Sequence, residues 1–418
     1  MVVRSDNPLK RTLDAVALRL EDALPTQVPF TYTYPPWILT LAGTLAITYL
    51  VHYRDTKLYR VALWPIAFGS AWWALLTIDL GGWRPMAINI VTIIVHSMTC
   101  STRWAFADDP PAYHPLPRRP PLDFVRRTTA FKSLDLFLNE FRLLSIAPYS
   151  PPLQRSAYGW FPHVLYHIGM FVFHLIVFDL STYPLFHLDP EGLGYPFGRA
   201  TDYNAGVDAL ATRFSVPRGL VRAALTLNVG LGCYAAMGLT AHLFAPVGMA
   251  TGLWCGEEWP GTMNKPFLAT SLSEFWGRRY HQRLRHWLLL VTSPFRRLPS
   301  YLYIPLIFLA SGFYHIVIHY PYHHRLALYP NLAMFVGAGL GNVIERLFLR
   351  LTGRRVGGWY GRIWTWTWLA IVSQPLVESW YELNIIGQYR WDMSKDPTGS
   401  VAHWLAYAFG IAPKPVKP

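Results

Sequence analysis

The chain contains, at residues 300–319, the apolar run SYLYIPLIFLASGFYHIVIH, which has no Asp, Glu, Lys or Arg. The uncharged stretch extends beyond the run on both sides, from Pro299 to Tyr322. A helix of about 20 apolar residues is long enough to cross the hydrocarbon core of a bilayer. The run therefore predicts a transmembrane helix.

Further runs of the same character are separated by segments that hold nearly all the charge. Only 15% of the 418 residues are charged, whereas about 25% are charged in a soluble domain. The sequence therefore predicts an all-α integral membrane protein with about eight transmembrane helices. Besides residues 300–319, the predicted spans are Trp37–Val51, Val61–Leu80, Pro85–Cys100, Trp160–Phe178, Ala223–Gly248, Asn331–Leu349 and Ile363–Ile386.

We expect residues 1–36 to form an N-terminal luminal segment and residues 37–418 to form a single polytopic membrane domain. Residues 1–36 carry mixed charge and no apolar core, so we expect the first span, and no cleaved signal peptide, to target the chain. The basic segments fall on alternate loops, which are therefore predicted to be cytosolic. These segments are Arg54–Arg60, Arg118–Arg155, Lys265–Arg297 and Arg350–Arg362.

The formal net charge of +13 does not indicate a nucleic-acid partner, because the Lys and Arg residues lie in the loops beside the spans. The three cysteines, Cys100, Cys233 and Cys255, have no CxxC spacing. We therefore expect neither a disulfide framework nor a thiolate metal site.

Two of the predicted cytosolic segments are long. Residues 101–156 are proline-rich and then become basic and amphipathic around Arg126–Phe141. This pattern fits either a segment that lies on the membrane surface or a solvated linker. Residues 255–299 carry the chemistry described next.

The second long segment combines arginines with aromatic residues. Glu258–Pro260 and Asn264–Pro266 are followed by SLSEFWGRRYH at Ser271–His281. Guanidinium groups bind phosphate, and aromatic faces stack on a base, so such a segment can hold an anionic ligand like coenzyme A. The alternative is a positively charged loop whose tryptophans lie at the membrane interface.

His315 lies inside the uncharged run, one helical turn from Ser311 and one from His319. A titratable side chain at that depth is costly unless it lines a cavity or has a partner, so His315 is a functional candidate. The alternative is an interhelical hydrogen bond.

The run Ser271–His281, with Trp259-Pro260 before it, resembles the signature of the wax-synthase domain, a branch of the membrane-bound O-acyltransferase superfamily. His315 is similar in position and context to the intramembrane histidine of that superfamily. The resemblance covers residues 258–320. Two features depart from the pattern: Tyr280 stands where the signature often has Trp, and Arg103-Trp104 lacks the expected neighbouring glycine.

The resemblance implies a multi-helix tunnel that acyl-CoA enters from the cytosol and a lipophilic alcohol enters through the bilayer. It implies that His315 is the general base and that His281 donates a hydrogen bond to the thioester or the developing oxyanion. Acyl-CoA would be a co-substrate, with no permanently bound cofactor and no metal. The phosphates or pantetheine arm would be held by Trp276, Arg278, Arg279 and Arg283.

The acceptor is open between a long-chain alcohol, as in a wax ester synthase, and a terpenoid or meroterpenoid alcohol, as in fungal enzymes that use acetyl-CoA. We favour the second, because an aromatic-rich interior suits polycyclic apolar ligands. The same tryptophans would also fit an interfacial belt. They are Trp364, Trp366, Trp368 and Trp380. The expected location is the endoplasmic reticulum membrane.

Two other classes remain as alternatives. A membrane di-iron hydroxylase or desaturase would use clustered histidines as iron ligands. By the predicted topology, however, His163 lies at the cytosolic end of its span and His323 and His324 lie on the luminal side. The histidines spaced for such a role are His163, His167, His174, His315, His319, His323 and His324.

A transporter or lipid-binding scaffold would explain the spans but not the Phe275–His281 pattern. Glu378, near Ser373 and Gln374, is predicted either to orient His315 or to pair with an interfacial arginine. We favour the arginine.

Overall fold

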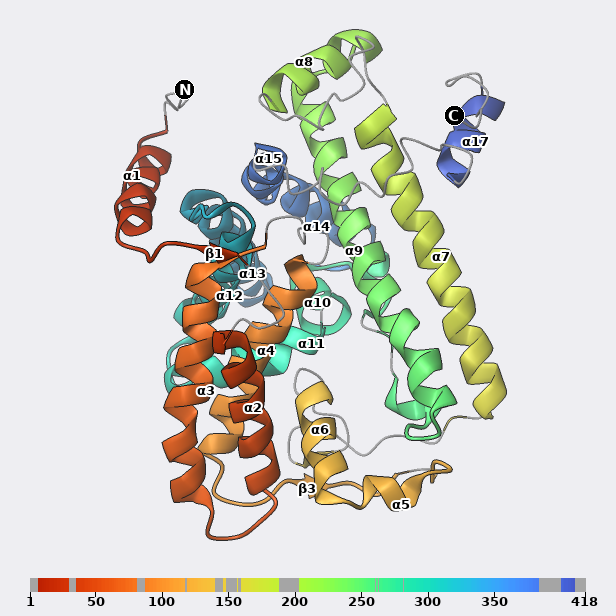
Figure 1. Cartoon of the computed structure of the whole chain (residues 1–418). Helices are drawn as coiled ribbons and strands as arrows, with labels where there is room; N and C mark the ends of the chain where they lie inside the picture. The colour runs from red at the N-terminus through yellow and green to blue at the C-terminus, as the bar shows by residue number, and fades with distance from the viewer. Residues whose placement is uncertain are drawn as a thin grey trace. The chain divides into compact units, whose positions relative to one another are not determined.

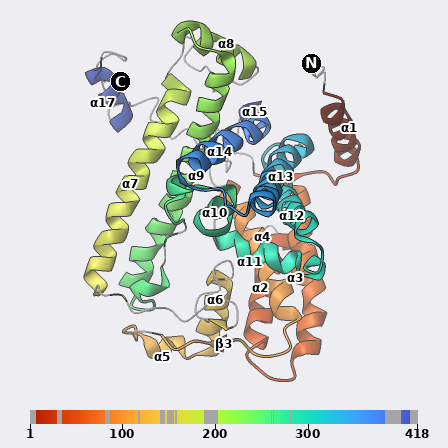
Figure 2. The same ribbon diagram turned by 180° about the vertical axis from the view of Figure 1, so that it is seen from behind.

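The structure is a computed structural model that describes residues 7–29, 35–80, 87–116, 119–139, 146–147, 156, 159–187, 203–259, 261, 263–280, 282–382 and 400–409. Helices make up most of this part of the chain (Figures 1 and 2). Strand β1 (Val28–Pro29) pairs in parallel with β2 (Ile78–Asp79). Strand β3 (Ala112–Tyr113) pairs antiparallel with β4 (Ile146–Ala147).

A helix lies at each predicted span. Four of these helices are long and apolar enough to cross a membrane: Trp160–Thr182 in α7, Arg218–Ala250 (α9), Ser300–Pro321 in α12, and Leu328–Thr352 (α13). Their length and composition support the predicted integral membrane protein, whereas a count of eight crossings stays a prediction. The other helices at predicted spans are α2 (Pro35–Leu50), α3 (Lys57–Thr77), α4 (Ala87–Ala105), α14 (Gly358–Val372) and α15 (Gln374–Glu382).

The remaining helices are shorter, and the sequence analysis did not predict them as spans. Two of the long helices extend beyond the apolar stretch given above: the whole of α7 is Trp160–His187, and the whole of α12 is Ser300–His323. The shorter ones are α1 (Pro8–Asp22), α5 (Asp123–Arg126), α6 (Thr129–Asn139), α8 (Tyr203–Phe214), α10 (Leu272–Glu274), α11 (Gln282–Val291) and α17 (Val401–Ala408), with one-turn elements η2 (Gly256–Glu258), η3 (Pro266–Leu268), η4 (Phe275–Arg279) and η5 (Ser293–Phe295).

The chain divides into two compact units. Unit 1 comprises Met1–Val164, Ala245–Pro260 and His281–Tyr329. Unit 2 comprises Leu165–Phe244, Gly261–Tyr280 and Pro330–Pro418. The single membrane domain over residues 37–418 and the luminal position of residues 1–36 stay predictions.

Helices α2, α3 and α4 of unit 1 lie side by side in both views. Small residues allow the close approach, because a Cβ added at Gly43 of α2 would lie 2.9 Å from the Cβ of Ala67 on α3. Ala71 and Leu75 of α3 and Ile94 of α4 are buried in one cluster with Tyr314 and Ile318 of α12. The core of unit 1 therefore includes the helix that carries His315.

A polar stripe on α2 is also buried. Thr40, Thr44 and Thr48 recur at every fourth residue and have no exposed surface. Their hydroxyls bond backbone carbonyls of their own helix and the hydroxyls of Ser70 and Ser133. Such pairings satisfy polar side chains between apolar helices without water.

Residues 119–139 are folded into unit 1 and are not an extended linker. The Arg126 guanidinium makes two hydrogen bonds of 2.7 Å to the Glu258 carboxylate, and both side chains are about nine-tenths buried. Burial alone would lower the pKa of Arg126, but the hydrogen bonds to Glu258 and its charge outweigh burial and raise it. The indole of Trp254 donates to Asp135 at 3.0 Å.

In unit 2, α7 and α9 lie side by side in both views. Nδ1 of His167 and Nδ1 of His242 are 2.8 Å apart, and Asn228 donates to the Ser181 carbonyl. A second contact joins α8 and α15, where Tyr203 packs on Tyr381 with ring centroids 5.1 Å apart. These pairs connect helices that are distant in sequence.

We expect Glu258→Gln to destabilise the protein, because Arg126 would keep its buried charge without a counter-charge. The expected loss is about 3–5 kcal/mol. The double variant Arg126→Met/Glu258→Met should recover much of it, since neither charge remains buried. Thermal unfolding of the detergent-purified proteins measures both effects. A single variant as stable as the native chain would contradict the pairing.

Candidate functional site

The segment 263–280 of unit 2 is a series of short turns held by its own side chains. Ser271 caps α10 by accepting the Glu274 N–H at 3.0 Å. The Glu274 carboxylate reaches back and accepts from both the N–H and the hydroxyl of Thr270. The next element, η4, is a π-helical turn, in which Tyr280 donates to the Phe275 carbonyl at 2.7 Å.

Arg279 closes this segment. Its Nε and Nη2 donate to Glu274 Oε1 at 2.8 and 2.6 Å. Its Nη1 donates to the carbonyls of Asn264 and Lys265, each at 3.2 Å. All three guanidinium nitrogens are therefore engaged within the segment, so Arg279 shapes the loop that was predicted to bind the acyl donor.

Arg278 behaves differently. Its side chain is exposed at the end of η4, and it makes no hydrogen bond or ion pair with the described part of the chain. The neighbouring Trp276 is half-buried and contacts Phe275 and Tyr280, with ring centroids 4.9 and 5.4 Å away. Of the predicted donor-binding residues of unit 2, Arg278 is the one with a guanidinium open to solvent.

Glu345 of α13 holds the start of α10, and the sequence analysis missed it. Its buried carboxylate accepts the backbone N–H groups of Leu272 and Ser273 at 2.6 and 3.0 Å. It also accepts the indole N–H of Trp364 on α14 at 3.0 Å. One turn earlier, Asn342 accepts the Ser273 hydroxyl at 3.0 Å. A lone acidic residue inside an apolar run was the available signal.

Three tryptophans of α14 pack around this segment. Trp366 contacts Phe275 at 5.9 Å and Phe267 at 6.3 Å between ring centroids. Trp364 and Trp368 are 4.9 Å apart and belong to the same partly buried cluster. Trp380 packs elsewhere in unit 2, against the cluster that contains Tyr203 and Tyr381.

Two glycines let α13 and α14 approach the segment. A Cβ at Gly361 would lie 2.2 Å from the Thr270 carbonyl oxygen, which belongs to the backbone. A Cβ at Gly341 would lie 2.4 Å from Nε1 of Trp368 and 2.5 Å from Leu272. The segment is therefore in direct backbone contact with α14.

His315 lies on α12 in unit 1 and is half-buried. Its Nδ1 is 2.7 Å from the carbonyl oxygen of Ser311, one turn earlier. A carbonyl only accepts, so Nδ1 carries the proton and Nε2 holds the lone pair. The His319 ring lies 5.9 Å away, and the adjacent Tyr314 packs on Trp287 of α11. The imidazole is thus held in the tautomer of a base that acts through Nε2.

The other predicted site residues are His281 and Arg283. His281 lies outside the described residues. Arg283 is on α11 in unit 1, and its side chain also lies outside the described part.

Glu378 accepts from Asn204 at 3.3 Å, and Asn204 in turn accepts from Arg222. Glu378 therefore reaches an arginine through an asparagine.

The histidines predicted as iron ligands fall into separate groups. His167 pairs with His242 of α9, which belongs to neither sequence cluster, and His174 stacks on His242 at 5.2 Å. His163 lies against Gly256 in unit 1. Within the described ranges, no three His, Cys, Asp or Glu side chains are grouped to hold a metal ion.

Residues 259–336 match the model of the membrane bound O-acyl transferase family. The matched stretch contains the whole segment 263–280 and His315. The match supports membership of the membrane-bound O-acyltransferase superfamily. No curated protein matches the chain.

We expect Gly361→Ala to destabilise unit 2 by about 1–3 kcal/mol, because the new methyl group would overlap a backbone carbonyl that cannot move freely. Gly277→Ala is the matched control, since nothing lies within 4 Å of its added Cβ. Thermal unfolding of both variants in detergent tests this. Equal unfolding midpoints for the two variants would contradict the close contact.

Glu274 should make unfolding depend on pH. Burial raises its pKa, but the hydrogen bonds from Thr270 and Arg279 and the charge of Arg279 bring it below the ordinary value of 4.5. The unfolded chain therefore takes up the proton first, so the stabilisation is present above about pH 4.5 and is lost as pH falls through the folded pKa. In Glu274→Gln, the unfolding midpoint should fall less steeply with acid; an unchanged acid slope would refute this.

Proposed function

We propose that the chain is a membrane-bound O-acyltransferase that moves an acyl group, preferentially acetyl, from acyl-CoA to the hydroxyl of a lipophilic alcohol. The family match over residues 259–336 carries the general activity. The acyl donor, the acceptor class and the residue roles are our proposal. It is supported by the tautomer of His315 and by the ordered aromatic and basic segment 263–280.

His315 would act as general base through Nε2. As the acceptor hydroxyl gives its proton to Nε2, its oxygen attacks the thioester carbonyl, and the resulting oxyanion collapses with loss of the coenzyme A thiolate. The imidazolium then returns the proton to that sulfur, so the ester and free coenzyme A are the products. A positioned base of this kind contributes about 10²–10⁴-fold to the rate, and no acyl-enzyme is needed.

His281 would donate a hydrogen bond to the carbonyl oxygen as negative charge develops there. Arg278 and Arg283 would bind the phosphates of coenzyme A, and Trp276 would pack on its base or pantetheine arm. Arg279 would act indirectly, because its guanidinium holds Glu274 and two backbone carbonyls. We place this donor site on the cytosolic side of an endoplasmic reticulum protein.

The acceptor we propose is a terpenoid or meroterpenoid alcohol. The aromatic surroundings of the segment, with Trp364, Trp366 and Trp368 packed together, support a rigid polycyclic ligand. The long-chain alcohol of a wax ester synthase is the second candidate. A panel of acceptors and of short and long acyl donors distinguishes them.

In microsomes, His315→Gln should lower acyl transfer from radiolabelled acetyl-CoA by about 10²–10⁴-fold, since the variant lacks a base. His174→Gln is the matched control, because His174 lies in α7 and makes the same bond of 2.7 Å from Nδ1 to the carbonyl one turn earlier. Full activity in His315→Gln, or an equal loss in both variants, would contradict the role of His315. Transfer only from palmitoyl-CoA to fatty alcohols would establish the wax ester synthase.

A further inference from the structure

Helix α1 of unit 1 is tied to the end of a membrane span. The Glu21 carboxylate accepts from the Leu326 N–H at 2.5 Å and from Arg325 at 3.2 Å. At the other end of the helix, Asn7 donates to the Tyr329 hydroxyl at 3.1 Å. Arg325 and Leu326 follow α12, so these contacts hold α1 at the end of the candidate membrane span Ser300–Pro321.

One face of α1 is apolar and uncovered. Leu9, Val16 and Leu20 recur at the spacing of one helical stripe and are 59%, 42% and 48% exposed. Ala17, on a different face of the helix, is buried. The stripe Leu9–Val16–Leu20 is therefore exposed and could contact an apolar partner such as acyl chains.

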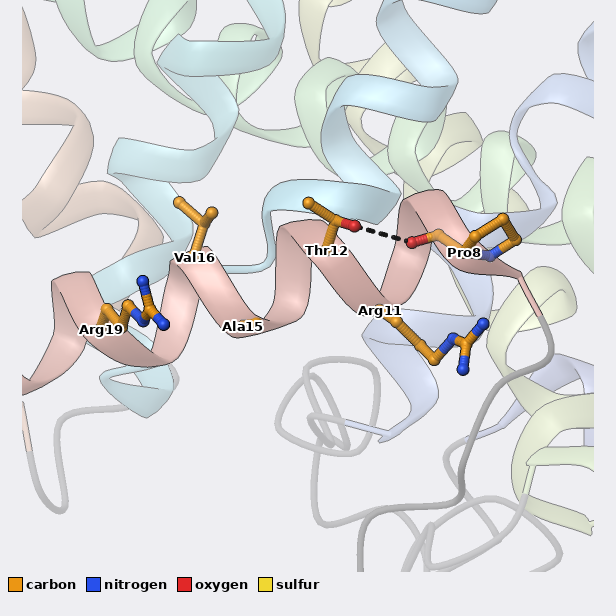
Figure 3. A pocket seen from close by; sticks show the side chains of 6 residues that line it. All are labelled: Pro8, Arg11, Thr12, Ala15, Val16 and Arg19. Atoms are coloured by element: carbon orange, nitrogen blue, oxygen red, sulfur yellow. Dashed lines mark hydrogen bonds between the residues drawn. The ribbon is translucent and has the colours of Figure 1, made fainter.

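A shallow, open groove of about 500 Å³ runs along α1 beside this stripe, and the described residues that line it all belong to α1 (Figure 3). Arg11 and Arg19 lie on either side of Ala15, whose small side chain leaves room between them. The Thr12 hydroxyl is already used, because it donates to the Pro8 carbonyl at 3.0 Å. At about 100° per residue, the middle of the groove lies about a quarter turn from the stripe.

Charge favours an anion in this groove. Neither Arg11 nor Arg19 makes a side-chain hydrogen bond or an ion pair within the ranges that the structure describes. Of the acidic residues of α1, Glu21 is engaged by Arg325, Asp14 is half-buried near Lys10, and Asp22 is exposed one turn beyond Arg19. Two guanidinium groups thus face solvent around Ala15.

We propose that α1 lies in the membrane surface and binds an anionic phospholipid, with its phosphate between Arg11 and Arg19 and its acyl chains along the stripe Leu9–Val16–Leu20. When the stripe faces the acyl chains, the groove turns towards the headgroup layer. Guanidinium groups bind phosphate oxygens bidentately, which suits a headgroup that approaches from the side. This site is separate from the proposed acyltransferase site and does not depend on it.

The test uses the full chain in nanodiscs of phosphatidylcholine with and without phosphatidylglycerol. Native mass spectrometry measures retained phosphatidylglycerol, whose apparent affinity should fall about fivefold for each arginine removed in Arg11→Gln and Arg19→Gln. Arg11→Lys/Arg19→Lys should retain part of the affinity. Arg54→Gln is the control and should change nothing, because Arg54 is an exposed arginine of unit 1 in the turn between α2 and α3.

A second experiment measures how deeply α1 lies in the membrane and leaves Arg11 and Arg19 unchanged. A fluorophore on Val16→Cys should be quenched by lipids that carry a nitroxide on the acyl chain, whereas one on Asp14→Cys should not. Absence of quenching at residue 16 would overturn the surface placement. An equal loss of phosphatidylglycerol in Arg54→Gln, or no loss in the arginine variants, would overturn the lipid site.

Discussion

The carboxylate of Glu345 is the interaction on which the segment 263–280 depends. The first backbone N–H groups of a helix have no partner within that helix, and leaving such a group buried and unpaired is costly. The first turn of α10 leaves two such groups, Leu272 N–H and Ser273 N–H, and Glu345 accepts both. The same carboxylate accepts a hydrogen bond from the indole N–H of Trp364. One buried carboxylate therefore joins the segment to α13 and α14.

Some charged side chains of the protein are paired with one another, and others are exposed to solvent. Arg279 and Glu274 neutralise each other inside the segment, and Arg126 and Glu258 do the same in unit 1. Each pair is surrounded by further hydrogen bonds to backbone groups, which is the condition under which a partly buried ion pair fixes geometry. Arg278, one residue from Arg279, remains exposed. An ordered loop that keeps one guanidinium outside is suited to bind a phosphate without first reorganising.

The sequence predicted the elements that follow from local composition. Each apolar run except the last falls on one helix, because length and lack of charge are properties of the run itself. The last run is divided at Ser373, where Pro375 in the first turn of α15 cannot donate a backbone hydrogen bond. Helix α1 was missed because its mixed charges hide the stripe Leu9–Val16–Leu20, whose members are seven and four residues apart.

The site was predictable to a smaller extent. The motif and His315 were found, but the role of Glu345 depends on an element about 70 residues away, which no local pattern shows. The pairing of Glu274 with Arg279 was hidden for another reason. In an α-helix the neighbours are three or four residues apart, whereas the π-helical η4 brings residues five apart onto one face. Arg279 was therefore interpreted as free for a ligand.

The hydrogen bond of His315 shows what geometry alone decides. Any helical histidine can donate Nδ1–H to the carbonyl four residues earlier, and His174 does so with Met170 at the same 2.7 Å. The bond therefore fixes the tautomer without marking a catalytic residue. What separates the two histidines is context, since the family match contains His315 and not His174. The chemistry proposed for His315 thus combines a tautomer set by its own helix with a position set by the matched stretch.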